Sequence, residues 1–261
     1  MDSKEQQEKL KFFVKTGIVV LSFLVIMMLG IRYIPKAVSV TNSANTKKLP
    51  IYCVDEKENK VALSFDAAWG NEDTAEILEI LALHNIKVTF FMTGGWIEKY
   101  PEDVKAIAAA GHDLGNHSEN HKHMSQLSLE ECKDEIITVH NKVKELTGIE
   151  MNLFRPPYGD YNDTLIDATD ELGYHCVQWD VDSLDWKDYG VEPLINSVLD
   201  NNRLSSGSII LCHNGSKFIK DALEAMIAGL EDKGYEIVPI SQLIFTDHYY
   251  MDHEGRQFQN N

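Results

Sequence analysis

The chain has 261 residues, 44% of them hydrophobic, and a formal net charge of −17 at pH 7. This length and composition suit one large domain with an appendage. The acidic charge argues against nucleic acid as a partner, because phosphates are bound through Lys and Arg. It is compatible with a neutral substrate such as a glycan.

The N-terminal part contains a long apolar run. No charged residue occurs between positions 16 and 31, and with Lys15 reaching outwards about 20 residues could span a bilayer core of roughly 30 Å. No A-x-A cleavage site follows, which favours an uncleaved anchor over a signal peptide. We predict a short cytoplasmic segment at residues 1–11, a transmembrane signal anchor at 12–33 and an extracytoplasmic tether at 34–58. The protein would cross the cell membrane once; secretion after signal cleavage is the alternative.

Beyond the tether, short apolar runs alternate with longer amphipathic runs. Strands that alternate with helices predict an α/β fold with a parallel sheet, and about seven repeats fit a distorted (β/α) barrel better than an open sheet. This domain would span residues 59–245, with a C-terminal tail at 246–261. The predicted strands are 61–65, 87–92, 113–115, 152–154, 175–179, 208–211 and 236–239, and the predicted helices are 72–84, 102–110, 129–147, 162–172, 191–201 and 219–233.

Titratable and cationic side chains follow the predicted strands directly. In a parallel β/α barrel the carboxyl ends of all strands meet at one face, and catalytic groups come from that face. We therefore expect these side chains to converge. They are Asp66 after the first strand, His117 and His121 after the third, Arg155 after the fourth, Asp182 and Asp185 after the fifth, and His213 after the sixth.

His117 and His121 are four residues apart. On a helical turn this spacing places both imidazoles on one side, close enough to share a cation such as zinc. Histidines four apart also occur by chance on protein surfaces, so the spacing alone is a weak signal. The four cysteines are scattered singly without a C-x-x-C pair, which argues against a structural zinc site.

The other candidates each have an ordinary alternative. Asp66 could act as a general base if it is partly desolvated, or it could be a turn residue. Residues 155–159, R-P-P-Y-G, form a stiff loop suited to holding an N–H at an oxyanion, or an ordinary turn. An acid beside His213 would orient its tautomer and raise its pKa. Trp69, Trp179 and Trp186 could form an apolar wall for a sugar ring, or pack in the core, and we expect Trp179 in the core because it lies inside a predicted strand.

Five motifs occur in order along the chain, and as a set they resemble the NodB-homology polysaccharide deacetylases, carbohydrate esterase family 4. The resemblance covers residues 59–245, and the membrane segment with F-D-x-x-W-G is most similar to sporulation-associated members. It implies a distorted (β/α) barrel that hydrolyses N-acetyl groups of N-acetylglucosamine or N-acetylmuramic acid in the cell wall. The motifs are F-D at 65–66, H-S-x-x-H at 117–121, R-P-P-Y-G at 155–159, D-S-x-D-W at 182–186 and L-x-H at 211–213.

The resemblance also implies roles for single residues. A divalent metal is implied, with zinc expected and cobalt or manganese as alternatives. Carried over by position, the roles are Asp66 as base, His213 as acid tuned by Asp185 in preference to Asp182, His117 and His121 as metal ligands, Tyr158 as the oxyanion N–H donor, Arg155 lining the groove and holding the base, and Leu211 with Trp186 as the acetyl pocket.

Ala67 departs from the family pattern, which has a second Asp at this position as a metal ligand. Three interpretations follow. Asp66 itself coordinates the metal; a water completes a weaker site of His117 and His121; or the protein binds glycan with little turnover, acting in cell-wall or spore-envelope assembly. The retained acid, base and orienting groups favour a working enzyme. Chitin-like oligomers or an acetylated xylan are alternative substrates, because the same groups would serve ester or amide.

Overall fold

The computed structural model describes residues 47–260. The predicted cytoplasmic segment at 1–11, the transmembrane anchor at 12–33 and the tether up to residue 46 lie outside the described residues. Among the helices of residues 47–260, none has the length and apolar character needed to cross a membrane.

A parallel sheet forms the centre of the described chain, as predicted. Its order is β6-β5-β4-β3-β2-β8-β7, and β9 pairs with the first residues of β2. Every neighbouring pair in this order runs parallel. The strands are β2 (Lys60–Ala67), β3 (Thr89–Met92), β4 (Asp113–Asn116), β5 (Leu153–Phe154), β6 (His175–Cys176), β7 (Val181–Asp182), β8 (Ile209–His213) and β9 (Glu236–Val238).

The two edges of this sheet belong to one continuous segment, residues 175–182. Its first part pairs with β5 and its last part with β8. Between them, the Val177 N–H donates to the Phe154 carbonyl at 2.8 Å and the Asp180 N–H donates to the Ile209 carbonyl at 3.2 Å. The sheet is therefore a curled half-barrel whose edges are bridged by one broken strand. The predicted single strand 175–179 is wrong in this respect, because the chain changes partner in the middle.

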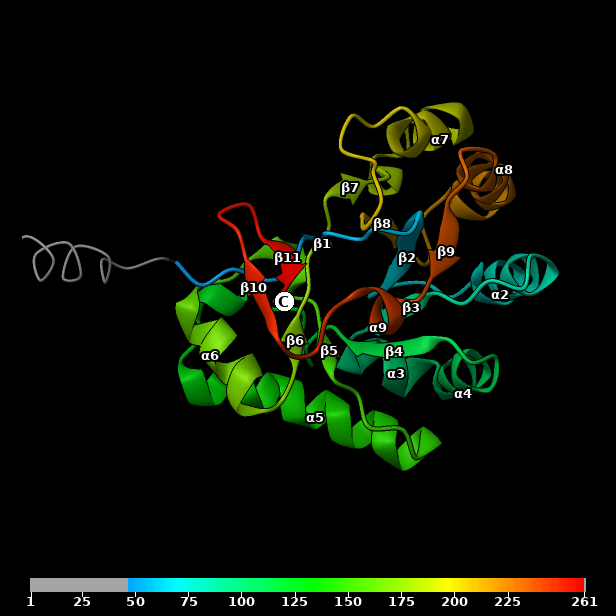
Figure 1. The fold of residues 1–261 in the computed structure, drawn as a ribbon. Helices are drawn as coiled ribbons and strands as arrows, with labels where there is room; N and C mark the ends of the chain where they lie inside the picture. Colours follow the sequence, from blue (N-terminus) through cyan, green and yellow to red (C-terminus); the bar gives the residue numbers. More distant parts are fainter. Residues whose placement is uncertain (1–46, 261) are drawn as a thin grey trace, which may run out of the picture. The chain divides into compact units, whose positions relative to one another are not determined.

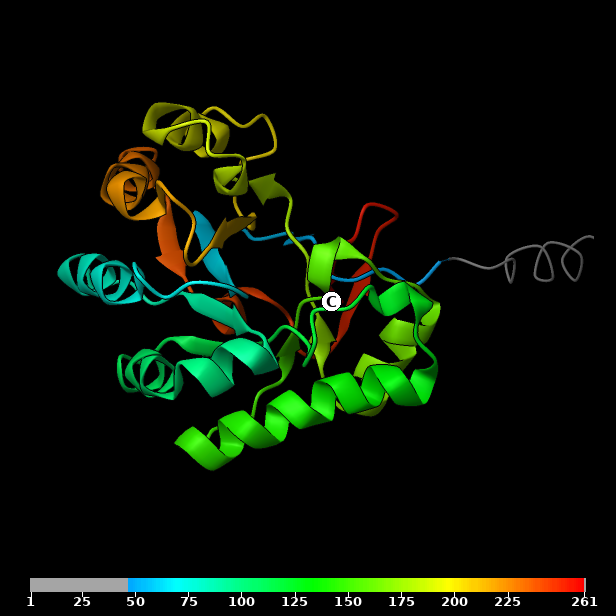
Figure 2. The same ribbon diagram turned by 180° about the vertical axis from the view of Figure 1, so that it is seen from behind.

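All helices of the described chain except α9 lie outside the strands (Figures 1 and 2), whereas Ile240 and Leu243 of α9 pack in the cluster of buried side chains inside the curl. The predicted six are confirmed with bounds shifted by at most a few residues, and two short helices, α3 and α9, were not predicted. Helix α5 has the predicted bounds because Ser128 and Glu131 form a capping box at its start and Gly148, with a left-handed φ of 76°, ends it. The helices are α2 (Thr74–Leu83), α3 (Gly94–Lys99), α4 (Pro101–Ala109), α5 (Leu129–Thr147), α6 (Asp163–Glu171), α7 (Val191–Leu199), α8 (Ile219–Asp232) and α9 (Ile240–Leu243).

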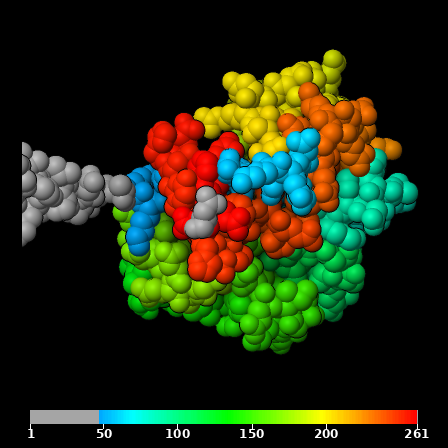
Figure 3. Space-filling model, viewed as in Figure 1, coloured from blue at the N-terminus to red at the C-terminus, as the bar shows by residue number. Residues whose placement is uncertain are grey.

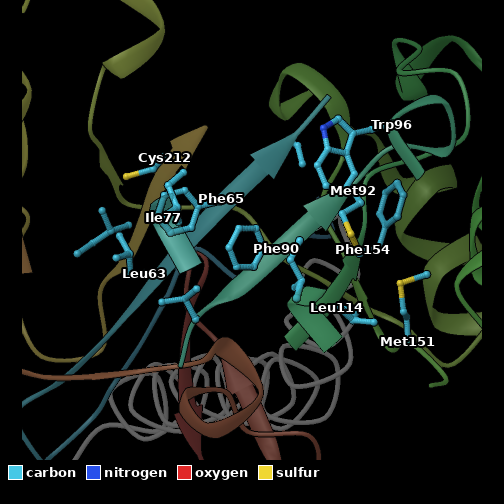
Figure 4. Packing of buried hydrophobic residues seen from close by; sticks show 14 of the residues in the cluster. Leu63, Phe65, Ile77, Phe90, Met92, Trp96, Leu114, Met151, Phe154 and Cys212 are labelled. Atoms are coloured by element: carbon cyan, nitrogen blue, oxygen red, sulfur yellow. The ribbon is translucent and has the colours of Figure 1, made fainter. Parts of the chain in front are cut away.

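Buried side chains form two clusters, one between sheet and helices and one inside the curl. Phe65 and Phe90, from neighbouring strands of the outer cluster, stack with ring centroids 5.2 Å apart (Figure 4). Ala62 belongs to the inner cluster. Because strand side chains alternate between faces, Asp66 shares the inner face with Ala62, whereas Ala67 packs in the outer cluster.

A second, small sheet has the order β1-β11-β10, built from β1 (Cys53–Val54), β10 (Tyr249–Met251) and β11 (Arg256–Gln259). The predicted tether at 34–58 and tail at 246–261 both contribute strands to it, so the folded unit extends beyond the predicted bounds 59–245. Figure 3 shows these segments, in blue and red, side by side on one face. The sequence indicates a short strand near residues 51–54, and β1 confirms it, whereas β10 and β11 are too short to show a periodicity that predicts them.

Candidate active site

A cavity of about 350 Å³ opens where the carboxyl ends of β2, β7 and β8 meet. Most predicted site residues line it, which confirms that they converge. Arg155 and Asp185 do not line it and are buried. The lining residues are Asp66, Trp69, His117, His121, Tyr158, Trp179, Asp182, Trp186, Leu211 and His213.

Asp66 is held by a buried arginine. The Arg155 Nη1 donates to Asp66 Oδ1 at 2.8 Å, and its Nη2 donates to the Gln178 carbonyl at 3.1 Å. The guanidinium also lies 4.2 Å from the centroid of the Phe91 ring. Burial alone would raise the pKa of Asp66, but the charges of Arg155 and His117 bring that pKa below its ordinary value. Asp66 is therefore a carboxylate, and the expectation that Arg155 lines the groove is wrong, because its side chain has no exposed surface.

His117 and His121 meet with ring centroids 5.0 Å apart. They lie in a loop, not on a helical turn, and His121 has a left-handed φ of 52°. The Nδ1 of His117 is 2.7 Å from the Arg155 carbonyl and donates to it, so Nε2 carries no proton and lies 3.5 Å from Asp66 Oδ2. Burial lowers the pKa of His117, and it lowers the pKa of His121 to about 4. Both rings are neutral near pH 7, the form that a metal ion requires.

The donors fit a divalent cation only in part. His117 has the carbonyl partner that typically orients a ligand imidazole. However, no group of three His, Cys, Asp or Glu suited to a metal ion occurs within residues 47–260. Ala67, at the position of the expected third ligand, is fully buried in the outer cluster. The described chain therefore offers a site of two histidines and not one of three protein ligands.

His213 is fixed by Asp185 through both its side chain and its backbone. The Nδ1 of His213 donates to Asp185 Oδ1 at 2.7 Å, and its backbone N–H donates to Oδ2 at 2.6 Å. Ser216, which was not predicted, donates its hydroxyl to the same Oδ2 at 3.0 Å. Burial would lower the pKa of His213, but the hydrogen bond and charge of Asp185 raise it above its ordinary value. Asp182 instead accepts from the Leu184 N–H at 2.8 Å, so the preferred partner is Asp185, as predicted.

Tyr158 lies on the predicted stiff loop with a left-handed backbone, φ 60°. Such a conformation is costly for a residue with a side chain and is found mainly where a site requires it. The exposed ring contacts the ring of His121 at 4.5 Å and stacks on His123 at 4.4 Å between centroids. His123 was not predicted, and no sequence signal separates it from an ordinary surface histidine.

Aromatic side chains form much of the cavity wall. Trp69 and Trp186 are 45% and 52% exposed, which rules out the core alternative for both. Leu211 is 2% exposed and still lines the cavity. Trp179, which the strand pattern would place in the core, also lines it. This wall of rings and one aliphatic side chain suits the apolar face of a sugar and a methyl group.

A sequence profile of the family described as Polysaccharide deacetylase matches residues 54–177. The chain is 36% identical to a peptidoglycan-N-acetylglucosamine deacetylase of Bacillus cereus, over 72% of this chain and 69% of that protein. It is 31% identical to the peptidoglycan-N-acetylmuramic acid deacetylase PdaA of Bacillus subtilis, over 81% of each. It is 33% identical to the uncharacterized protein YlxY of Bacillus subtilis over 75% of this chain, and spans 60% of that relative.

Solved structures of relatives share the fold. The crystal structure of a pseudoenzyme of carbohydrate esterase family 4 from Bacillus anthracis matches with a TM-score of 0.72 and 31% identity, over 80% of this chain and 70% of that chain. A mutant of that protein is described as having restored enzymatic activity. The chain is thus similar both to proteins named as deacetylases and to a pseudoenzyme.

Proposed function

The chain belongs to the polysaccharide deacetylase family, and we propose that it hydrolyses N-acetyl groups of peptidoglycan amino sugars, N-acetylglucosamine or N-acetylmuramic acid. One observation carries this proposal. Asp66 and His213 are register partners at the ends of adjacent strands, and each is held by a buried partner of opposite charge, Arg155 and Asp185. A carboxylate and an imidazole with a raised pKa therefore face one cavity, as general base and general acid require.

In the proposed reaction Asp66 is the general base and His213 is the general acid. Asp66 Oδ2, which Arg155 leaves free, takes a proton from a water whose oxygen bonds to the amide carbon. The C–N bond then breaks, and His213 Nε2 gives its proton to the leaving nitrogen, so that acetate and a free amine leave. Asp185 stabilises the protonated imidazole before that transfer. The Tyr158 N–H is proposed as the donor to the oxyanion, and Trp186 with Leu211 as the pocket for the acetyl methyl.

A divalent cation is part of the proposal, with zinc first and cobalt or manganese as alternatives. His117 and His121 would hold it, and it would polarise the amide carbonyl when bound. Because Ala67 supplies no carboxylate, binding should be weaker than at a site with three protein ligands.

A second candidate function is supported by Ala67 and by the similarity to a pseudoenzyme. In that case the chain binds glycan in the cell wall or spore envelope with little turnover. The intact ion pairs of Asp66 and His213 favour the enzyme, because a binding protein has no need of a proton donor and acceptor fixed by buried partners.

We further propose that the protein is held in the cell membrane by residues 12–33, with the domain outside. The uncharged run in the sequence supports this location. Fractionation with alkaline washing tests it. Retention in the membrane pellet supports the anchor, and release into the medium with a shortened N-terminus supports the alternative of a secreted protein.

The test of the function uses the purified full chain in detergent with N-acetylated muropeptides and added zinc, cobalt or manganese. We expect acetate release, reduced by at least about 100-fold in Asp66→Asn and in His213→Gln. Chitin oligomers and acetylated xylan serve as comparison substrates. If no metal supports release while calorimetry shows glycan binding, the second candidate is correct.

A further inference from the structure

Trp69 packs face to face on the imidazole of His213. The two ring centroids are 5.3 Å apart and the ring planes differ by 21°. Trp69 lies in the loop that follows β2 and is 45% exposed, and it also lines the cavity. One face of the indole therefore covers the histidine, and the remaining surface is open to a ligand.

The loop that carries Trp69 is hydrogen-bonded to Asn214, the residue that follows His213 at the end of β8. The Gly70 carbonyl accepts from Trp96 Nε1 at 2.9 Å and from Asn214 Nδ2 at 3.0 Å. Trp96 is itself buried in the outer cluster (Figure 4). These bonds fix the backbone next to Trp69 independently of any ligand, because neither Trp96 nor Asn214 lines the cavity.

A glycine permits the close contact between the two loops. Gly215 has a φ of +86°, and a Cβ there would lie 3.1 Å from Trp69 Cδ1 and 3.2 Å from the Gly70 backbone. The Gly215 N–H donates to both carboxylate oxygens of Asp73 at 2.9 Å. The backbone conformations of both loops therefore allow the indole to lie close to the imidazole.

The charges around His213 show what the stacked ring adds. Asp185, Asp66 and Asp182 favour the protonated imidazole, whereas burial opposes it. His117 and His121 also lie near enough to oppose it when they are protonated. An indole face attracts a cation packed against it, which favours the protonated imidazole. It also shields that face of the ring from water, which opposes protonation, and we expect the attraction to be the larger of the two effects.

We propose that Trp69 is a positioning residue for the proton donor: it clamps the His213 imidazole against Asp185, so that Nε2 points at the leaving nitrogen. The inference rests on the proposed function, in which His213 is the acid. The end of β2 and the loop that follows it would then supply both the base, Asp66, and the ring that fixes the acid. A residue that served only as a sugar platform would affect substrate binding and leave the histidine unchanged.

The test compares Trp69→Phe and Trp69→Leu with the full wild-type chain. Tyr189→Leu is the matched control, because Tyr189 is an exposed aromatic outside the residues that line the cavity. The His213 imidazole is followed by NMR titration with labelled histidine, and its signal is identified by its loss in His213→Gln. This readout needs no turnover, so it stands even if the wild type releases no acetate.

For Trp69→Leu we expect the pKa of His213 to fall by about half a unit, with a smaller fall in Trp69→Phe and none in Tyr189→Leu. In acetate assays, kcat should fall about 10-fold for Trp69→Leu, by more than KM rises. Phe keeps a ring at this position and serves as the test if the Leu variant does not fold. A His213 titration that is unchanged in both Trp69 variants would overturn the proposal, as would a rise in KM with kcat unchanged.

Discussion

Asp185 accepts two hydrogen bonds from His213, and its negative charge stabilises the protonated imidazole that the proposed reaction uses. Asp185→Asn keeps the shape of the side chain, but it removes the charge that raises the pKa of His213 and replaces one of the two acceptor oxygens by an NH2 donor. A proton donor works below its pKa, so activity should be lost as pH rises through that value. In Asp185→Asn this loss should move to lower pH, with kcat reduced on the order of 100-fold. A pH profile of acetate release measures both.

The same shift has a consequence for stability. Because the pKa of His213 is raised in the folded protein, its pairing with Asp185 contributes fully below the unfolded value of 6.5 and is lost as pH rises through the folded value. Urea unfolding of the wild type and Asp185→Asn should therefore differ more at pH 6 than at pH 9. An equal difference at both pH values would contradict the raised pKa.

The pKa of His112 is shifted downwards, opposite to that of His213, so its contribution to stability is lost at low pH. Burial lowers its pKa to about 4, and its Nδ1 accepts from the Val88 N–H at 3.2 Å, which a protonated ring could not do. The contribution of neutral His112 to the unfolding free energy should be complete above pH 6.5 and decline by up to about 3 kcal/mol as pH falls towards 4. Denaturant unfolding of His112→Asn should show less of this acid decline than the wild type. His253→Asn, at an exposed histidine, should decline as the wild type does.

Ala67 is fully buried among apolar side chains of the outer cluster, where an introduced carboxylate would lose its contact with water. Ala67→Asp should lower the unfolding free energy by about 3 kcal/mol without metal, because a charged group is placed in the outer cluster. If the Asp can turn to the two histidines, zinc should restore part of that loss, and it should not do so in Ala67→Asn. Thermal unfolding with and without zinc measures this, and identical zinc responses of the two variants would show that position 67 cannot reach the cation.

At the scale of single elements, α5 shows how much local sequence can specify. Ser128 accepts from the Glu131 N–H, and Glu131 bonds back to Ser128, so the predicted start of the helix is correct. Ser128→Ala should lower the unfolding free energy by about 1 kcal/mol. Thr138→Ala, on the exposed face of the same helix, should change it by less than about half of that. Urea unfolding compares the two.

Other elements depend on contacts that sequence periodicity does not contain. The strand that begins at His175 breaks because its later residues pair with β8 in place of β5, and the change is stabilised by Asp180, whose carboxylate accepts from the Ile209 N–H at 2.9 Å. Helix α3 has only six residues, too few for a helical period. Arg155 reads as a surface residue, yet it is fully buried through its bonds to Asp66 and Gln178.

At the scale of the whole described chain, the small sheet ties both ends of the folded unit together. The buried Gln257 links β11 to the end of the main domain: its Nε2 donates to the Phe245 carbonyl at 2.9 Å, and its Oε1 accepts from the Phe245 N–H at 3.0 Å. Gln257→Ala should lower the unfolding free energy by about 1 kcal/mol, because it leaves the partly buried backbone N–H and carbonyl of Phe245 without this partner. Gln259→Ala, exposed on the same strand, should have little effect in the same unfolding measurement.

The arrangement of strands explains why the site was more predictable than the details of the fold. Parallel strands bring their carboxyl ends to one face whatever their exact bounds, so Asp66, His117 and His213 converge even though several strand ends were misplaced. Sequence order cannot show which side chains stack or become buried at that face. The contact of Trp69 with His213 and the burial of Arg155 therefore emerge only in three dimensions.

Acetate release from N-acetylated muropeptides by the unmodified chain, measured with zinc, cobalt and manganese, tests the central claim most directly. The account predicts release with at least one metal, removed by a chelator and by Asp66→Asn. Absence of release with every metal, from a chain that is folded and binds the glycan, would contradict it and identify the protein as a binding member of its family.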